Sequence, residues 1–261
     1  YISEEAWRRI FNPPWQVEGA FPGYIMEDNG NTVGFLGLIF SERRIGNRTK
    51  VFINMTSWIV LEKYRKKSIF MILPLLKMRG VVLTDLTPSD EVYRILTKAN
   101  FVAFDKAYRL IFPWKRRFGK KRDFQIIRNR KVIESRLEDG HLTTYRDHSF
   151  EHCYHYLIES PRGSCYFIMT RMARRTFPFL FARLQYVSDV TIFRMALPSI
   201  VSTICRYTGA AALIVGERFL AAGKMVGSLK RSFDNPMMYR GEDIKKEDID
   251  TLYSESILLN I

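Results

Sequence analysis

The sequence predicts an α/β fold, a mixed sheet flanked by helices, arranged in two lobes. Apolar runs of strand length, rich in β-branched residues, alternate with segments that have helical periodicity. In the first lobe a meander of strands precedes the order β-α-β-α-β, which is typical of mixed α/β architecture. A basic stretch interrupts this pattern, and a similar order of helices and strands then starts again. We therefore expect a first lobe at 1–113, a basic connector at 114–131 and a second, more divergent lobe at 132–261 that repeats the first.

Local signals place the elements of the first lobe. Ser3 before an amphipathic segment predicts a capped helix that ends before Pro13. The pair Asn29-Gly30 between two apolar runs predicts a hairpin. Ser89 precedes a second helical segment, which is expected at 90–98. Strands are expected at 24–27, 33–40, 50–60 and 81–83.

Composition excludes a disordered chain and favours anionic partners. Of the 261 residues, 47% are hydrophobic and 14% aromatic, which is enough for a packed core. The formal net charge of +14 points to a coenzyme, an acidic polymer, nucleic acid or an anionic membrane surface, without choosing among them. Three widely spaced cysteines form neither a disulfide framework nor a metal motif, so we expect a reducing cytoplasm. The longest apolar runs are far shorter than the ~20 residues of a membrane-spanning helix.

The stretch 54–70 is the strongest functional signal in the chain. An apolar strand ends at Leu61, a cationic turn follows at 64–68, and an apolar segment that is compatible with a helix begins at Ile69. The first amides of a helix lack partners and the helix dipole favours negative charge there, while nearby Arg and Lys add positive charge. This arrangement predicts a site for a phosphate or pyrophosphate group.

The same stretch and the elements after it resemble the GNAT superfamily of acyl-CoA-dependent N-acyltransferases. The family motif runs roughly V-x-P-x-x-R-G-x-G-x-G/A, and here Ile59, Leu61 and Arg65 stand at its Val, Pro and Arg. The motif's three small positions hold Lys66, Ser68 and Phe70. A later family signature, a helix that ends in Tyr-x-x-x-Gly-Phe, falls on 96–101, where Leu replaces the Tyr and Asn the Gly. The resemblance covers 1–113.

The resemblance implies where acyl-CoA would bind. The pantetheine arm would lie along Ile59, Val60 and Leu61, and the Val60 or Leu61 amide would polarise the thioester carbonyl. The pyrophosphate would lie on the amides of 66–69. The residues implied to bind the coenzyme are Ile59, Val60, Leu61, Arg65, Lys66, Lys67, Ser68, Ile69 and Ser89.

Acyl transfer to an amine also needs groups that move protons. The acidic residues Asp85, Glu62 and Asp90 are the candidates to take the proton of the attacking amine, directly or through water. Tyr93, one helical turn before Leu96, is the candidate acid for the leaving thiolate, and packing is the other explanation for it.

The second lobe carries weaker functional signals. A helix expected at 142–158 places His148, His152 and His155 on nearly one face, and we interpret it as a half-buried helix rather than a metal site. Asp189 is expected to cap a helix that ends at Gly209. An aspartate at this strand-to-helix junction would repel a pyrophosphate, so only the first lobe is predicted to bind coenzyme.

Two functions follow from these observations. In the first, the protein transfers an acetyl or other acyl group from acyl-CoA to an amine of an acidic or phosphorylated acceptor. In the second, it is a catalytically inactive module whose basic run Lys115–Arg122 contacts nucleic acid or another anionic polymer. Binding of the coenzyme distinguishes the first from the second.

Overall fold

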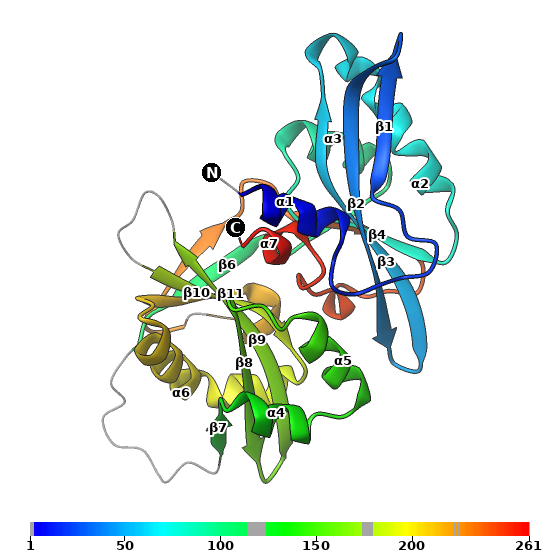
Figure 1. Ribbon diagram of the computed structural model, residues 1–261. Coiled ribbons are helices and arrows are strands. Elements are labelled where there is room, and N and C mark those ends of the chain that lie inside the picture. The colour runs from blue at the N-terminus through cyan, green and yellow to red at the C-terminus, as the bar shows by residue number, and fades with distance from the viewer. Residues whose placement is uncertain (1–2, 114–123, 174–179, 222, 224, 261) are drawn as a thin grey trace. The chain divides into compact units, whose positions relative to one another are not determined.

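The computed structural model describes residues 3–113, 124–173, 180–221, 223 and 225–260 (Figure 1). The chain forms two compact units, and each contains one mixed sheet with flanking helices. Unit 1 consists of Tyr1–Lys106 and Asp234–Leu259, and unit 2 consists of Ala107–Phe233. The α/β class predicted from the sequence is confirmed.

Unit 1 contains a six-stranded sheet in the order β1-β2-β3-β4-β13-β5. Strands β1, β2 and β3 form an antiparallel meander, β3 and β4 pair in parallel, and β13 pairs antiparallel with both β4 and β5. Its elements are α1 (Glu4–Phe11), β1 (Gly23–Asp28), β2 (Asn31–Ile45), β3 (Arg48–Val60), the 3₁₀ helix η1 (Glu62–Met71), α2 (Leu73–Lys77), β4 (Val81–Asp85), α3 (Asp90–Lys98), β5 (Val102–Phe104), β13 (Met237–Arg240), η3 (Lys246–Asp248) and α7 (Glu255–Leu258).

Unit 2 contains a seven-stranded sheet in the order β12-β6-β11-β10-β9-β8-β7. It has the same plan as the sheet of unit 1: antiparallel strands, one parallel pair (β10 and β11), then further antiparallel strands. Its elements are β6 (Ala107–Ile111), β7 (Gln125–Ile127), α4 (Arg130–Arg136), α5 (Asp139–Asp147), β8 (Cys153–Ser160), β9 (Gly163–Ala173), β10 (Leu180–Val187), α6 (Val190–Thr208), β11 (Ala212–Gly216), η2 (Glu217–Phe219) and β12 (Ser228–Ser232).

The units divide the chain differently from the predicted lobes 1–113 and 132–261. Strand β6 lies before the basic stretch yet pairs within the sheet of unit 2, and β13 comes from the C-terminal segment yet lies between β4 and β5 of unit 1. Hydrogen bonds between strands more than a hundred residues apart decide both assignments. A local sequence pattern carries no information about such pairings.

Local capping signals are confirmed where the sequence was explicit. Ser3 accepts a hydrogen bond from the Ala6 amide at 3.2 Å, and Asn29 and Gly30 have the positive φ angles, 50° and 77°, that a tight hairpin requires. Asp189 accepts from the amides of Thr191 and Ile192 at 2.8 and 2.9 Å. Helix α6, which packs on the core of unit 2 (Figure 1), begins after this cap and ends at Gly209, whose φ is 70°.

Removal of the α6 cap should measurably weaken unit 2. Asp189→Ala is expected to lower the free energy of unfolding by about 1 kcal/mol, because two amides of the first turn lose their acceptor. Urea unfolding followed by circular dichroism measures this change. Thr191→Ala, an exposed change in the same turn, is the control; an equal loss in both variants would contradict a capping role.

The predicted histidine helix at 142–158 is wrong. Helix α5 ends at Asp147, and the following residues form β8, which pairs with β9. His155 bonds the Tyr166 hydroxyl at 2.7 Å through Nδ1 and the His148 carbonyl at 3.0 Å through Nε2. Burial lowers the pKa of His155 to about 4. Both His155 nitrogens are thus engaged within the fold, and the part of the chain described here has no group of three His, Cys, Asp or Glu able to hold a metal.

The C-terminal segment contains two short helices. They are the 3₁₀ helix η3 and, after it, α7. Glu255 is the first residue of α7. It is buried in unit 1, where it is 4% exposed.

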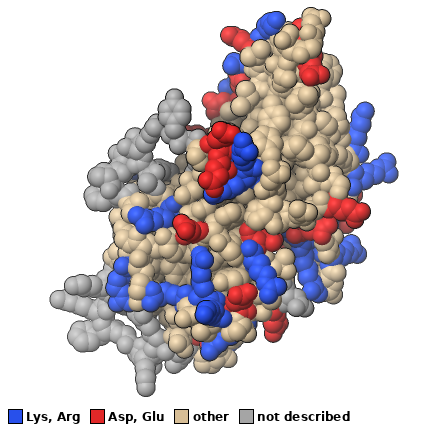
Figure 2. Space-filling view, viewed as in Figure 1, with Lys and Arg blue, Asp and Glu red and all other residues tan. Residues whose placement is uncertain are grey.

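The charged side chains do not gather into one continuous patch on the face shown in Figure 2, where Lys and Arg are interspersed with Asp and Glu. The basic run Lys115–Arg122 lies outside the described residues. Within the described ranges, none of the helices combines the length and the apolar character needed to cross a bilayer.

Candidate functional site

Strands β3 and β4 separate at the centre of unit 1. They pair in parallel from Val51 and Val81 to Asn54 and Thr84, after which β3 alone continues to Val60. A bulge in β3 marks the separation: the register with β2 shifts, and Ser57 adopts a φ of 50°. In open α/β sheets the crevice beyond the carboxyl ends of parallel strands is where ligands bind.

The glycines of β2 allow this bulge. A side chain on Gly37 would place its first carbon 3.1 Å from the Thr56 carbonyl oxygen, and one on Gly34 would lie 3.1 Å from a Val60 methyl group. Glycines inside a strand commonly mark such a bulge or a close approach of a neighbouring strand.

A cavity of about 510 Å³ lies beyond this separation. Trp58, Ile59 and Val60 from the end of β3 form one side. Arg65, Lys66 and Ser68 from η1 form the second. The third comes from the start of α3 and contains Ser89, Glu91, Val92, Arg94 and Ile95.

The lining combines positive charge with apolar surface. Three cations, Arg65, Lys66 and Arg94, face one carboxylate, Glu91. The Trp58 side chain also lines the cavity, and its indole N–H is buried without a hydrogen-bond partner among the described residues. These features fit a ligand with phosphate groups and a less polar arm.

Six of the nine predicted coenzyme residues line this cavity: Ile59, Val60, Arg65, Lys66, Ser68 and Ser89. The other three do not. Lys67 is exposed, Ile69 packs against the core, and the Leu61 amide donates to the Val33 carbonyl at 2.9 Å. Leu61 is therefore not a free donor for a thioester carbonyl, and that prediction is wrong for Leu61.

The predicted cationic turn at 64–68 is part of the 3₁₀ helix η1. In such a helix each amide donates to the carbonyl three residues earlier, so the amides of 66–69 are already paired. The physical reason is the missing glycines, since Lys66 and Phe70 favour a regular backbone over an open loop. The side chains of Arg65 and Lys66, rather than amides, therefore supply the positive lining.

Of the predicted proton-transfer residues, only Asp85 lies in a perturbed environment. Burial, and then the nearby Glu255 carboxylate, raise the pKa of Asp85 from 3.8 to about 8, although the Thr87 amide donates to it at 3.2 Å. Glu62 is exposed at the start of η1, and Tyr93 packs against the core of unit 1. None of the three residues Asp85, Glu62 and Tyr93 is among those that line the cavity.

A network of buried polar groups surrounds Glu255 where β3 and β4 separate. Asn54 Nδ2 donates to Glu255 Oε2 at 2.7 Å, and the Thr87 hydroxyl donates to Glu255 Oε1 at 2.5 Å. The Thr84 hydroxyl in turn donates to Asn54 Oδ1 at 3.1 Å. Two acids thus lie close together in a buried site, one with a raised pKa and the other held by two donors.

Sequence reasoning missed several of these residues. Arg94 and Glu91 share the exposed side of α3, and the capped helical pattern after Ser89 was a signal that could have placed them beside the cavity. Trp58 adjoins residues that were predicted, and its orientation follows from the bulge. Glu255 had no local signal, because its partners lie 168 and 201 residues away.

Comparison with known proteins supports the fold. No family model matches the sequence, and no curated protein matches it. A conserved protein of unknown function from Enterococcus faecalis, described as a probable N-acyltransferase, is 13% identical with a TM-score of 0.52, over 84% of this chain and 60% of that chain. A GCN5-related N-acetyltransferase from Anabaena variabilis is 12% identical with a TM-score of 0.49, over 83% and 61%.

A third similar structure is the N-myristoyltransferase of Saccharomyces cerevisiae with bound myristoyl-CoA, 10% identical with a TM-score of 0.43 over 97% of this chain and 78% of that chain. The chain spans only about three fifths of the length of the first two structures. The similarity to the Enterococcus structure shows that the two proteins share an α/β fold.

Proposed function

We propose that the protein transfers an acyl group from acyl-CoA to an amine of an acceptor. The cavity beyond the separated strands β3 and β4 carries this proposal, because it is where the family resemblance places the coenzyme and because its lining suits one. Arg65, Lys66 and Arg94 would bind the phosphates, and the apolar surface of Ile59 and Val60 would contact the pantetheine arm.

The buried acid pair supplies a route for the proton. In the reaction the amine nitrogen bonds to the acyl carbon, the carbon–sulfur bond breaks, and the amine must lose a proton. Asp85 and Glu255 lie where the two strands part, so a water molecule could carry that proton to the pair. An ionisation near pH 8 suits a base that must release the proton again. The released thiolate would take up a proton from solvent or from this pair.

The acceptor and the acyl group are proposed more broadly. The net charge of +14 favours an acidic or phosphorylated acceptor, since a positive field concentrates anions near the protein. Acetyl-CoA is the first acyl donor to test.

Coenzyme binding tests the proposal. Calorimetric titration with acetyl-CoA is expected to show binding that Arg65→Ala/Lys66→Ala weakens tenfold or more, about 1.4 kcal/mol, because two phosphate contacts are lost. The matched control is Lys77→Ala/Arg79→Ala, which removes one Lys and one Arg that are exposed and do not line the cavity.

The control variant distinguishes binding in the cavity from nonspecific electrostatic attraction to the whole protein. If both double variants weaken binding equally, the net charge of the protein, rather than the cavity, attracts the coenzyme. If the folded parent chain binds neither acetyl-CoA nor free CoA, the proposed function is wrong. Repeating the titration at two salt concentrations shows whether the difference between the variants persists when long-range attraction is screened.

A further inference from the structure

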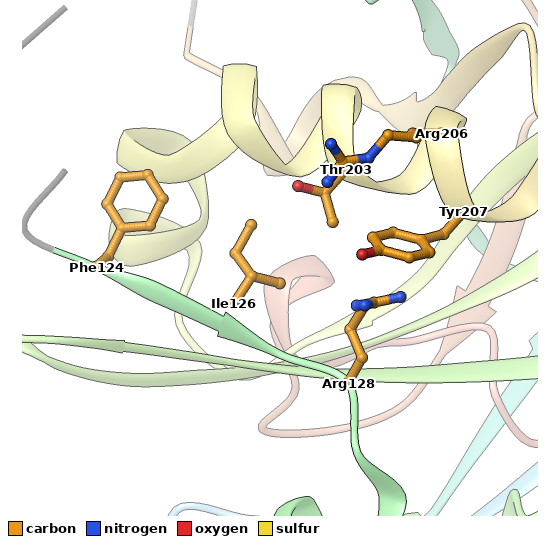
Figure 3. A pocket seen from close by; sticks show the side chains of 6 residues that line it. All are labelled: Phe124, Ile126, Arg128, Thr203, Arg206 and Tyr207. Atoms are coloured by element: carbon orange, nitrogen blue, oxygen red, sulfur yellow. The ribbon is translucent and has the colours of Figure 1, made fainter. Parts of the chain in front are cut away.

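A second cavity, of about 230 Å³, lies within unit 2 between the edge strand β7 and the last turns of α6 (Figure 3). Its lining residues point toward a common space: Phe124, Ile126 and Arg128 from β7 and its flanks, and Thr203, Arg206 and Tyr207 from α6. The cavity is built wholly within unit 2, and none of these residues takes part in the proposed acyl transfer.

Two guanidinium groups converge on one aromatic ring in this cavity. The Arg128 guanidinium carbon lies 3.0 Å from the centre of the Tyr207 ring, and that of Arg206 lies 5.1 Å from it. Neither arginine forms an ion pair with a carboxylate in the described part of the chain. Like charges held close together without a counter-charge are the arrangement that a bound anion stabilises.

The rest of the lining is suited to a small ligand that also has an apolar part. The hydroxyls of Thr203 and Tyr207 are hydrogen-bonding groups, and both lie on the same side of α6 as Arg206 (Figure 3). Phe124 and Ile126 form an apolar wall opposite them (Figure 3). A cavity of about 150 Å³ can hold a benzene ring, so this one has room for a ring together with a phosphate group.

A purely structural role explains only part of this arrangement. Arg206 lies in the last turn of α6, where a cation interacts favourably with the helix dipole without any ligand. Arg128, however, follows β7 on the other side of the cavity and directly precedes Asn129, the N-cap of α4, where the helix dipole disfavours a cation. Its guanidinium stacks on Tyr207, which leaves its N–H groups at the ring's edge available to an anion.

We propose that this cavity binds a phosphate monoester attached to a flat ring. The phosphate would take hydrogen bonds from the guanidinium groups of Arg128 and Arg206, with the Thr203 hydroxyl as an additional donor. The ring would lie against Phe124 and Ile126. A monoester is favoured over a diester because its second negative charge matches the second arginine.

Titration with phenyl phosphate, followed by ³¹P NMR line broadening, tests this site. Saturable binding is expected, and Arg128→Gln/Arg206→Gln should raise the dissociation constant tenfold or more. Inorganic phosphate should bind more weakly because it lacks the ring, and phenol, added as a competitor, should displace phenyl phosphate only weakly because it lacks the charge. Phenyl phosphate should also bind better than the diester methyl phenyl phosphate.

The control variant Arg162→Gln/Arg231→Gln removes the same charge from exposed positions of unit 2 that do not line the cavity. It should bind phenyl phosphate as the parent does. Equal weakening in both double variants, or no saturable binding by the folded parent, would overturn the proposal. The variant Arg65→Ala/Lys66→Ala should retain the binding, and its loss there would assign the probe to the cavity of unit 1 instead.

Discussion

Asp85→Asn is expected to stabilise unit 1 at alkaline pH and to remove most of its pH dependence between pH 4 and 8. In the folded chain the pKa of Asp85 is about 8, against an ordinary value of 3.8, so between these values the native state holds a proton that the unfolded state has lost. The free energy of unfolding therefore falls as pH rises through this range, by up to roughly 1.4 kcal/mol per pH unit. Above pH 8 the full penalty, roughly 6 kcal/mol for a pKa raised from 3.8 to about 8, is present.

Urea unfolding of the parent and of Asp85→Asn at pH 5, 7 and 9 measures this difference. Trp15, which is 6% exposed in unit 1, reports the transition by fluorescence. The variant should be more stable than the parent by roughly 1.6 kcal/mol at pH 5 and by several kcal/mol at pH 9. Asp234→Asn, at an exposed position of the same unit, is the control and should follow the parent. A parent curve that is flat from pH 5 to pH 9 would show that Asp85 ionises normally.

Glu255→Ala is expected to cost about 3 kcal/mol at pH 5. The change removes the acceptor for the Asn54 amide and the Thr87 hydroxyl, and a buried donor left unpaired costs about 1–3 kcal/mol. At pH 9 the loss should be smaller, because Asp85 is then ionised and the variant is relieved of the repulsion between the two carboxylates.

The same urea series measures how much smaller the loss is at pH 9 than at pH 5. Glu255→Gln keeps the shape and one acceptor oxygen and should lose less than Glu255→Ala at pH 5, so it serves where the alanine variant does not fold. The double variant Asp85→Asn/Glu255→Ala completes the cycle and should show no dependence of the Glu255 effect on pH. A Glu255 effect that is the same at both pH values in the parent background would contradict coupling between the two acids.

The sequence by itself determined the α/β class, the capped helices and the hairpin. These features depend on residues within a few positions of one another: Ser3 with Ala6, Asn29 with Gly30, and Asp189 with the amides that follow it. The sequence also predicted most of two sides of the cavity. The residues concerned, Ile59, Val60, Arg65, Lys66 and Ser68, all belong to one recognisable motif.

Predictions failed where the observed pairing or backbone conformation differed from the one that the local sequence pattern favoured. Three histidines at helical spacing suggested a helix, yet His155 lies in β8 because pairing with β9 buries the aromatic run around it. The cationic stretch at 64–68 was expected to be an open loop and instead forms a 3₁₀ helix, since no glycine there favours the loop.

Only the tertiary structure decided which strands complete each sheet and which acids meet. Strand β13 enters unit 1 between β4 and β5, and the same C-terminal segment brings Glu255 to Asn54 and Asp85. Arg128 and Arg206 likewise meet on the ring of Tyr207 although the two arginines are far apart in the chain. Such meetings depend on strand pairing and helix packing over long sequence separations, whereas the sequence pattern records only the preferences of each short segment.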